Sequence, residues 1–143
     1  MTDNLKLIRL LLQMVAITVV TGCASTTQVV PMPDQSQSVS DVNKARIYVM
    51  RPSSIGGANT MTVLDGYERI GDTGGNGYLC WERDPGEVEI RSSGWRISTI
   101  KFKCEEGVAY YILQRAENVL ELVSEEEGKK WLQQSSRAGV KLK

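Results

Sequence analysis

Short runs of β-forming residues, separated by turn-forming residues at regular intervals, occupy most of this 143-residue chain between positions 45 and 123. The runs cover residues 45–50, 59–64, 67–72, 78–82, 88–92, 96–104, 110–115 and 119–123. No segment between two runs is long enough for the crossover helix that usually joins neighbouring parallel strands. The pattern therefore predicts an all-β fold, a small antiparallel β-sandwich of seven or eight short strands.

Turn chemistry supports this division of the chain. Asp65-Gly66 is a strong two-residue hairpin signal, and Asp84-Pro85-Gly86 is typical of a tight turn. The 96–104 run alternates apolar residues with lysines, which predicts one buried and one exposed face. We expect the loop 51–59 to cross between sheets. The glycine-rich loop 73–77 has no following helix or Lys-Ser/Thr pair, so it does not predict a phosphate site.

The last part of the chain, residues 125–143, differs from the β-rich part. Ser124 precedes Glu125-Glu126-Glu127, a capping-box pattern with a glutamate at the third helical position. We therefore expect a short helix that continues to about Ser136 and then a tail. Large buried aromatic side chains dominate small cores, which favours packing of Trp131 on the sheet over its exposure as a contact surface.

Residues 1–22 have the layout of a secretory signal peptide. Lys6 and Arg9 precede a mostly apolar stretch, residues 10–21, that is shorter than the roughly 20 residues needed to span a membrane. Extending this stretch back to Leu5, as a retained membrane helix, would place both basic residues in the bilayer at high cost. The pattern favours a signal peptide that is removed.

The apolar stretch ends in Val20-Thr21-Gly22-Cys23, which resembles the lipobox of bacterial lipoproteins. The resemblance implies cleavage before Cys23, a diacylglyceryl group on its sulfur and an acyl chain on its amine. More than one acyl chain gives stable membrane anchoring. Lipoproteins with aspartate after the cysteine are retained in the inner membrane. Ala24 therefore favours the outer membrane, with the domain facing the periplasm.

The segment after Cys23 is rich in Ser, Thr, Gln and Pro and shows no apolar periodicity. This composition is typical of a flexible linker. We therefore expect residues 23–43 to form a lipidated, flexible tether with a stretched reach of about 65 Å. The β-sandwich domain, residues 44–124, would then move freely above the membrane.

Composition excludes several kinds of site. The chain contains no histidine, which removes His-based catalytic triads and His-ligated zinc or copper sites. Its 17 basic and 17 acidic residues balance, and loss of residues 1–22 leaves the chain close to neutral. A dedicated nucleic-acid surface would show a basic excess. We expect no nucleic-acid partner, no metal and no cofactor.

Cys80 and Cys104 are the cysteines that remain beside Cys23. In an oxidising cell envelope two such cysteines favour a disulfide, provided that the strands carrying them are neighbours and both side chains point into the core. Such a bridge would stabilise the fold by roughly 3 kcal/mol in the chain-entropy model. Two buried free thiols remain the alternative.

Trp95 is the best candidate for a contact residue, because it stands in a Ser-Gly-Trp-Arg turn with no core to enter. A flat aromatic face of this kind stacks on sugars. Trp81 alternates with Leu79 and is expected in the core. The acidic residues lie mostly in turns, where turn formation and solubility explain them better than a glycosidase carboxylate pair does.

The order of several strand-and-turn phrases is similar to that of a bacterial lipoprotein family known as domain of unknown function 2846. The phrases are Ala45-Arg46-Ile47-Tyr48-Val49-Met50-Arg51-Pro52-Ser53-Ser54, Val63-Leu64-Asp65-Gly66, Gly77-Tyr78, Pro85-Gly86-Glu87, Glu106-Gly107-Val108-Ala109-Tyr110-Tyr111 and Leu120-Glu121-Leu122-Val123. The resemblance covers roughly residues 44–124 and implies a small β-sandwich in the cell envelope without a known activity. Gly94-Trp95 and Cys104 depart from the family pattern.

These features predict a membrane-anchored envelope lipoprotein that is not an enzyme. The expected role is a protein-interaction or structural accessory module whose partner is another envelope protein. A module that binds glycans or small ligands through Trp95 is the alternative. An envelope hydrolase is a distant third, because the sequence shows neither a histidine nor an activated nucleophile.

Overall fold

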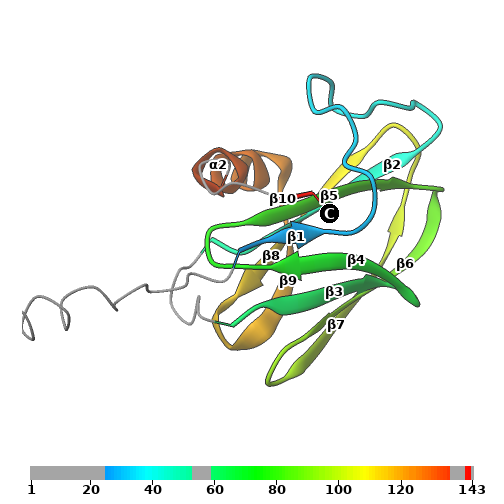
Figure 1. The fold of residues 1–143 in the computed structure, drawn as a ribbon. Coiled ribbons are helices and arrows are strands. Elements are labelled where there is room, and N and C mark those ends of the chain that lie inside the picture. Colours follow the sequence, from blue (N-terminus) through cyan, green and yellow to red (C-terminus); the bar gives the residue numbers. More distant parts are fainter. Residues whose placement is uncertain (1–24, 53–58, 136–140, 143) are drawn as a thin grey trace, which may run out of the picture.

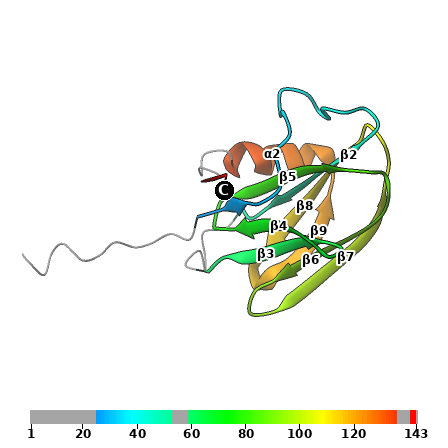
Figure 2. The same cartoon turned by 45° about the vertical axis from the view of Figure 1, so that its right-hand side comes forward.

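A computed structural model describes residues 25–52, 59–135 and 141–142, and the statements below concern these residues. Its elements form two packed β-sheets with a helix against one of them (Figures 1 and 2). The strands are β1 (Thr27–Gln28), β2 (Ala45–Met50), β3 (Met61–Asp65), β4 (Glu68–Thr73), β5 (Tyr78–Arg83), β6 (Gly86–Ser93), β7 (Ile97–Cys104), β8 (Ala109–Arg115), β9 (Val119–Val123) and β10 (Lys141–Leu142). A 3-10 helix, η1 (Ala116–Asn118), precedes β9, and α2 (Glu125–Ser135) follows it.

The sheet topology confirms the predicted small all-β sandwich. One sheet has the order β10-β1-β4-β3-β6-β7, and the other has the order β5-β2-β8-β9. The eight predicted runs correspond to β2 through β9, with ends that differ by one or two residues. Two pairings, β1 with β10 and β2 with β8, are parallel, so each sheet is mixed rather than purely antiparallel. The connection from β2 to β3 crosses between the sheets, as expected for the loop 51–59.

The main core fills the space between the two sheets. Alternation along each strand decides which side chains enter it. On β7 the lysines are exposed, whereas Ile100 and Phe102 pack against the core, which confirms the predicted two-faced strand. The buried members of this core are Ala45, Ile47, Val49, Val63, Ile70, Leu79, Trp81, Val88, Ile90, Cys104, Ile112 and Leu120.

A second apolar cluster lies on the outer face of the four-stranded sheet, under α2. Ser124 Oγ accepts a hydrogen bond from Glu127 N at 3.2 Å and caps the helix, as the sequence predicts. Trp131 packs on the cluster, which also includes Tyr111. A Cβ atom at Gly128 would overlap the Tyr111 ring, so a residue without a side chain lets the helix approach the sheet closely.

Residues 25–43 lie against the sandwich, which corrects the prediction that they form a flexible linker. Thr26 is buried, and its Oγ1 accepts a hydrogen bond from Gly74 N at 2.9 Å. Thr27 and Gln28 form a strand beside β4, and Val29 N donates to Ile70 O at 2.8 Å. Backbone hydrogen bonds and buried polar side chains hold this segment, so apolar periodicity is not needed to fix it.

Within the residues that the structure describes, no helix is long and apolar enough to span a membrane.

Candidate functional site

The pairing register places one residue from each of five strands of the larger sheet in a row across the sheet. Thr27 pairs with Asp72, Asp72 with Thr62, Thr62 with Ser93, and Ser93 with Ile97. Each neighbouring pair in this row is antiparallel, so β1 and β7 run in the same direction. The residues that precede Thr27 and those that precede Ile97 therefore extend toward the same end of the sheet. Residues 25 and 26 and the β6–β7 turn therefore lie at one end of the sandwich. Figures 1 and 2 show β1 and this turn on the same side.

The β6–β7 turn carries Trp95 at its apex. Gly94 N donates to Arg96 O at 3.0 Å and closes the turn around Trp95. The Trp95 side chain is 74% exposed. The Arg96 guanidinium lies 5.6 Å from the centre of the Trp95 ring, within cation–π range. The expected exposure of Trp95 is confirmed.

Two further apolar side chains are exposed beside this turn. Ile97 begins β7 and is 72% exposed, and Val119 begins β9 and is 52% exposed. The two strands are linked beside these residues, because the backbone N–H of Leu120 donates to the side-chain Oγ of Ser98 at 3.1 Å. We call Trp95, Ile97 and Val119 the apolar tip. Scattered apolar residues are ordinary on a surface, but three at one end of a sandwich suggest a contact surface.

A buried polar network supports the apolar tip from inside the sandwich. Thr73 Oγ1 donates to Gln114 Oε1, and Gln114 Nε2 donates to Ser92 Oγ. Ser92 Oγ donates to Asn118 Oδ1 at 2.5 Å, and Asn118 Nδ2 donates to Arg96 O at 2.6 Å. Asn118 itself has a positive φ of 60° and is buried. The network links both sheets and fixes the backbone of the turn, so the tip is held in one arrangement.

The structure contradicts the predicted disulfide between Cys80 and Cys104, because both are free thiols. Cys104 ends β7 and lies in the core between the sheets. Cys80 lies on the outer face of β5, in the cluster under α2. The apolar face of Tyr78 and Cys80 is therefore the outer one, whereas Trp81 on the opposite face enters the main core.

The two thiols are predicted to be unreactive in the folded protein. Both are buried, and burial raises the pKa of Cys80 to about 12, so its nucleophilic thiolate is scarce at neutral pH. Titration of the mature protein with a chromogenic disulfide reagent should find no thiol under native conditions. It should find two after unfolding without reductant. If no thiol were found in the unfolded protein, the result would instead support the predicted disulfide.

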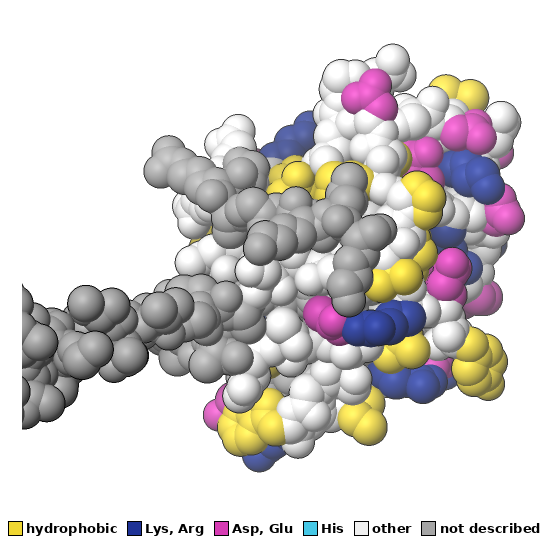
Figure 3. All heavy atoms as spheres, viewed as in Figure 1, with side chains coloured by type: hydrophobic (Ala, Val, Ile, Leu, Met, Phe, Trp, Pro, Cys, Tyr) yellow, Lys and Arg dark blue, Asp and Glu magenta, His cyan; other side chains and the backbone are white. Residues whose placement is uncertain are grey.

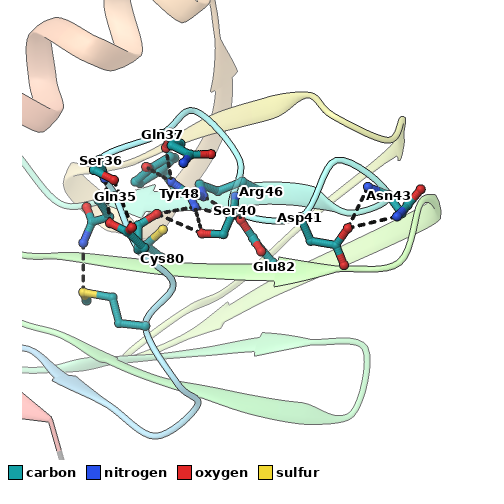
Figure 4. A network of polar contacts seen from close by, with 12 residues as sticks. Gln35, Ser36, Gln37, Ser40, Asp41, Asn43, Arg46, Tyr48, Cys80 and Glu82 are labelled. Atoms are coloured by element: carbon teal, nitrogen blue, oxygen red, sulfur yellow. Dashed lines mark hydrogen bonds and ion pairs between the residues drawn. The ribbon is translucent and has the colours of Figure 1, made fainter.

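Arg46 on β2 is the centre of a polar network that joins residues 34–40 to Glu82 on β5 and that was not expected from the sequence (Figure 4). Its fully buried guanidinium donates to Glu82 Oε1 at 2.8 Å and to Ser40 Oγ at 2.7 Å. It also donates to the carbonyl oxygens of Asp34 at 2.6 Å and Gln37 at 2.7 Å. Residues 34–40 thus fold over Arg46 and cover one part of the outer face of β2.

The alternation of residues along β2 could have indicated this network. Arg46 shares its face of β2 with Tyr48, whose ring stacks on Tyr111 at a centroid distance of 5.1 Å. Burial raises the pKa of the Tyr48 hydroxyl, which accepts a hydrogen bond from Arg46 at 3.3 Å. A charged residue on an apolar strand face requires a polar cover. Among the described residues, the segment that provides this cover is the one that was assigned to the linker.

Trp81 is buried, as predicted, and its Nε1 donates to Asp65 Oδ2 at 2.9 Å. A groove of about 340 Å³ lies between residues 30–33 and the side chains of Glu68 and Glu82, but Glu82 is already bonded to Arg46. Among the residues that the structure describes, no group of three acidic or cysteine side chains is placed to hold a metal ion.

Cys23, the predicted lipidation site, lies outside the described residues. No family model, curated protein or solved structure matches this chain, so the family resemblance stays a prediction.

Proposed function

We propose that this protein is a lipid-anchored lipoprotein of the bacterial cell envelope that acts as a non-catalytic interaction or structural module. The observation that carries the proposal is the lipobox at Val20-Thr21-Gly22-Cys23, placed directly before a chain that packs from Thr26 onward. Ala24 supports the outer membrane and a domain that faces the periplasm. The partner we expect is another envelope protein.

The short chain between the lipid and the domain determines how close to the membrane the domain is held. Cys23 and Thr26 are three residues apart, so the chain between them spans about 10 Å at most. Thr26 is fixed in place, because Gly74 donates to it and the Cβ-free Gly77 leaves room for its side chain. A lipid on Cys23 would therefore hold the sandwich at the membrane surface rather than on a long tether.

The chemistry of the side chains supports a non-catalytic role. The chain has no histidine, and both described cysteines are buried as free thiols. Several acidic groups at the sandwich surface form ion pairs, as Glu89 does with Arg91 and Lys101, each at 2.8 Å. Exposed ion pairs of this kind contribute little to stability and are ordinary on a solvated protein surface.

Replacement of Cys23 with Ser should leave an unprocessed, unlipidated precursor. Serine lacks the sulfur to which the diacylglyceryl group would be attached, and lipobox processing follows lipidation. The variant should retain residues 1–22 and migrate as a larger species, and metabolic labelling with a fatty acid should be lost. Gel mobility, labelling and intact mass of the membrane fraction measure this change.

Ser25 provides the matched control, since Ser25→Ala changes an exposed residue two positions after Cys23. It should be processed and labelled as the wild type is. If Cys23→Ser were processed and labelled like Ser25→Ala, the lipoprotein assignment would be wrong.

Exposure of Trp95 supports glycan binding as the second candidate. One face of an indole that is 74% exposed is available to stack on a sugar ring, and Arg96 beside it can donate hydrogen bonds. Retention of the protein on peptidoglycan or polysaccharide, lost in Trp95→Ala, would favour this function over protein interaction.

A further inference from the structure

We propose that the apolar tip, formed by Trp95, Ile97 and Val119, rests on the surface of the bilayer that holds the lipidated Cys23. The protein would then be docked with this end of the sandwich toward the lipid. The inference rests on the proposed lipid anchor and adds a second membrane contact to it.

The register brings the tip and the anchor to the same end. Thr27 and Ile97 belong to one row across the larger sheet, and the chain leaves this row in the same direction at both positions. Four strand spacings of about 4.8 Å separate them, or roughly 19 Å. Because the chain from Cys23 to Thr26 spans about 10 Å at most, a modest tilt of the sandwich brings the tip to the lipid surface.

The tip has the chemistry of a membrane interface. Tryptophan is enriched where a bilayer meets water, since its ring is apolar and its N–H is polar. Arg96 lies beside the Trp95 ring and makes a long, exposed ion pair with Glu117 at 3.9 Å, so its guanidinium can exchange this partner for a lipid phosphate. Ile97 and Val119 supply apolar surface next to them. A protein partner is not needed to explain why these side chains are exposed.

Charge favours the same orientation. The opposite end of the sandwich carries the β5–β6 and β7–β8 turns, whose charged residues are Asp84, Glu105 and Glu106. Lys44 pairs with Asp84 at 2.9 Å. An anionic bilayer repels this net acidic end. Figure 3 shows acidic side chains of the visible face on the side away from β1, interspersed with basic ones.

The buried polar network lowers the cost of docking. Asn118 and Gln114 fix the backbone around the β6–β7 turn before any contact is made, so little conformational entropy is lost on binding.

Tryptophan fluorescence of the lipidated protein in vesicles tests the proposal. The mature protein is reconstituted into phosphatidylethanolamine–phosphatidylglycerol vesicles, with or without lipids brominated near the top of the acyl chain. Bromine quenches an indole only at short range, and Trp81 is buried inside the sandwich. We expect partial quenching of the wild type, loss of that quenching in Trp95→Phe, and its retention in Trp131→Phe.

A matched pair of charge variants keeps all tryptophans in place. Ile97→Asp adds a charge to the tip, and Tyr67→Asp adds one at the opposite end, where Tyr67 is 98% exposed. Both sites tolerate a polar residue because neither side chain is buried. We expect Ile97→Asp to abolish the quenching of Trp95 and to shift its emission to the red, and Tyr67→Asp to change neither.

The possible outcomes separate the two claims. Protein that does not float with the vesicles contradicts the lipid anchor itself. Protein that floats but shows no bromine quenching, or equal quenching in both aspartate variants, overturns docking through the tip and leaves the anchor intact. A shift of Trp95 emission with soluble peptidoglycan fragments, without bromine quenching, assigns the tip to a glycan instead.

Discussion

Arg46→Met is expected to reduce the free energy of unfolding by about 3–5 kcal/mol, because it removes one partner of a buried ion pair. The guanidinium is fully buried, and the Glu82 side chain that accepts from it is only 14% exposed. Methionine fills similar space but donates no hydrogen bond. Glu82 would keep its charge without this counter-ion, and the carbonyl oxygens of Asp34 and Gln37 would lose their donor.

Urea unfolding followed by tryptophan emission measures this loss. For a domain of this size the corresponding fall in melting temperature is roughly 10–20 °C. Arg69→Met is the matched control, since Arg69 is exposed and its ion pair with Asp72 lies at the surface. This control should cost less than about 1 kcal/mol. Equal losses in the two variants would show that Arg46 does not organise residues 34–40.

A double variant isolates the charge of Glu82. In the Arg46→Met background, Glu82→Gln removes a carboxylate that has lost its counter-ion, so it should recover part of the lost stability. In the wild-type background the same change should destabilise the protein, because it leaves Arg46 buried without its negative partner. Opposite signs in the two backgrounds would demonstrate the ion pair directly.

Strand positions could be predicted because their signals are local. The β-forming runs and the Gly-containing turns lie within a few residues of each other, and each of the eight runs appears as a strand. The parallel pairing of β2 with β8 could not be predicted in the same way. It brings Val49 beside Ile112 across more than sixty residues, and no short pattern encodes such a pairing.

The prediction for Cys80 and Cys104 failed for a related reason. Alternation shows that Tyr78 and Cys80 share a face of β5, but not which face points between the sheets. In this protein α2 and residues 34–40 cover the outer face, so apolar residues occur on both sides of the four-stranded sheet. The exposure of Trp95 was predictable because it depends on a short turn alone.

The segment 25–43 has a polar composition because its contacts are polar. Gln28 and Thr26 bond to backbone groups, and residues 34–40 offer carbonyl oxygens to Arg46. Apolar periodicity, on which the linker prediction relied, is absent from such contacts. Composition alone therefore does not separate a flexible linker from a chain that covers buried polar groups.

Gln28→Leu is expected to reduce the free energy of unfolding by about 2–4 kcal/mol, because it leaves two buried backbone groups without partners. β5 is the edge strand of its sheet, and the Gln28 side chain acts there as a substitute for a neighbouring strand. Its Oε1 accepts from Cys80 N at 3.0 Å, and its Nε2 donates to Cys80 O at 2.7 Å. Leucine has similar volume but satisfies neither group.

The control is Gln37→Leu, since Gln37 is exposed and bonds to Arg46 through its backbone carbonyl. It should change stability by less than about 0.5 kcal/mol. Urea unfolding measures both variants, and limited proteolysis should cleave Gln28→Leu, but not Gln37→Leu, before β2. Stability equal to the control would mean that the amide bonds of Gln28 do not hold β1 to the sandwich.

Loss of Gln28 also has a consequence at the membrane. Once β1 detaches, the first fixed residue is no longer Thr26 but Asp34, whose carbonyl oxygen Arg46 still holds, so the chain between Cys23 and the sandwich becomes several times longer. The apolar tip is unchanged in this variant, yet the lipid no longer holds it near the bilayer. Bromine quenching of Trp95 should therefore fall in Gln28→Leu without any change at the tip, because the effective concentration of the tip at the surface decreases with tether length.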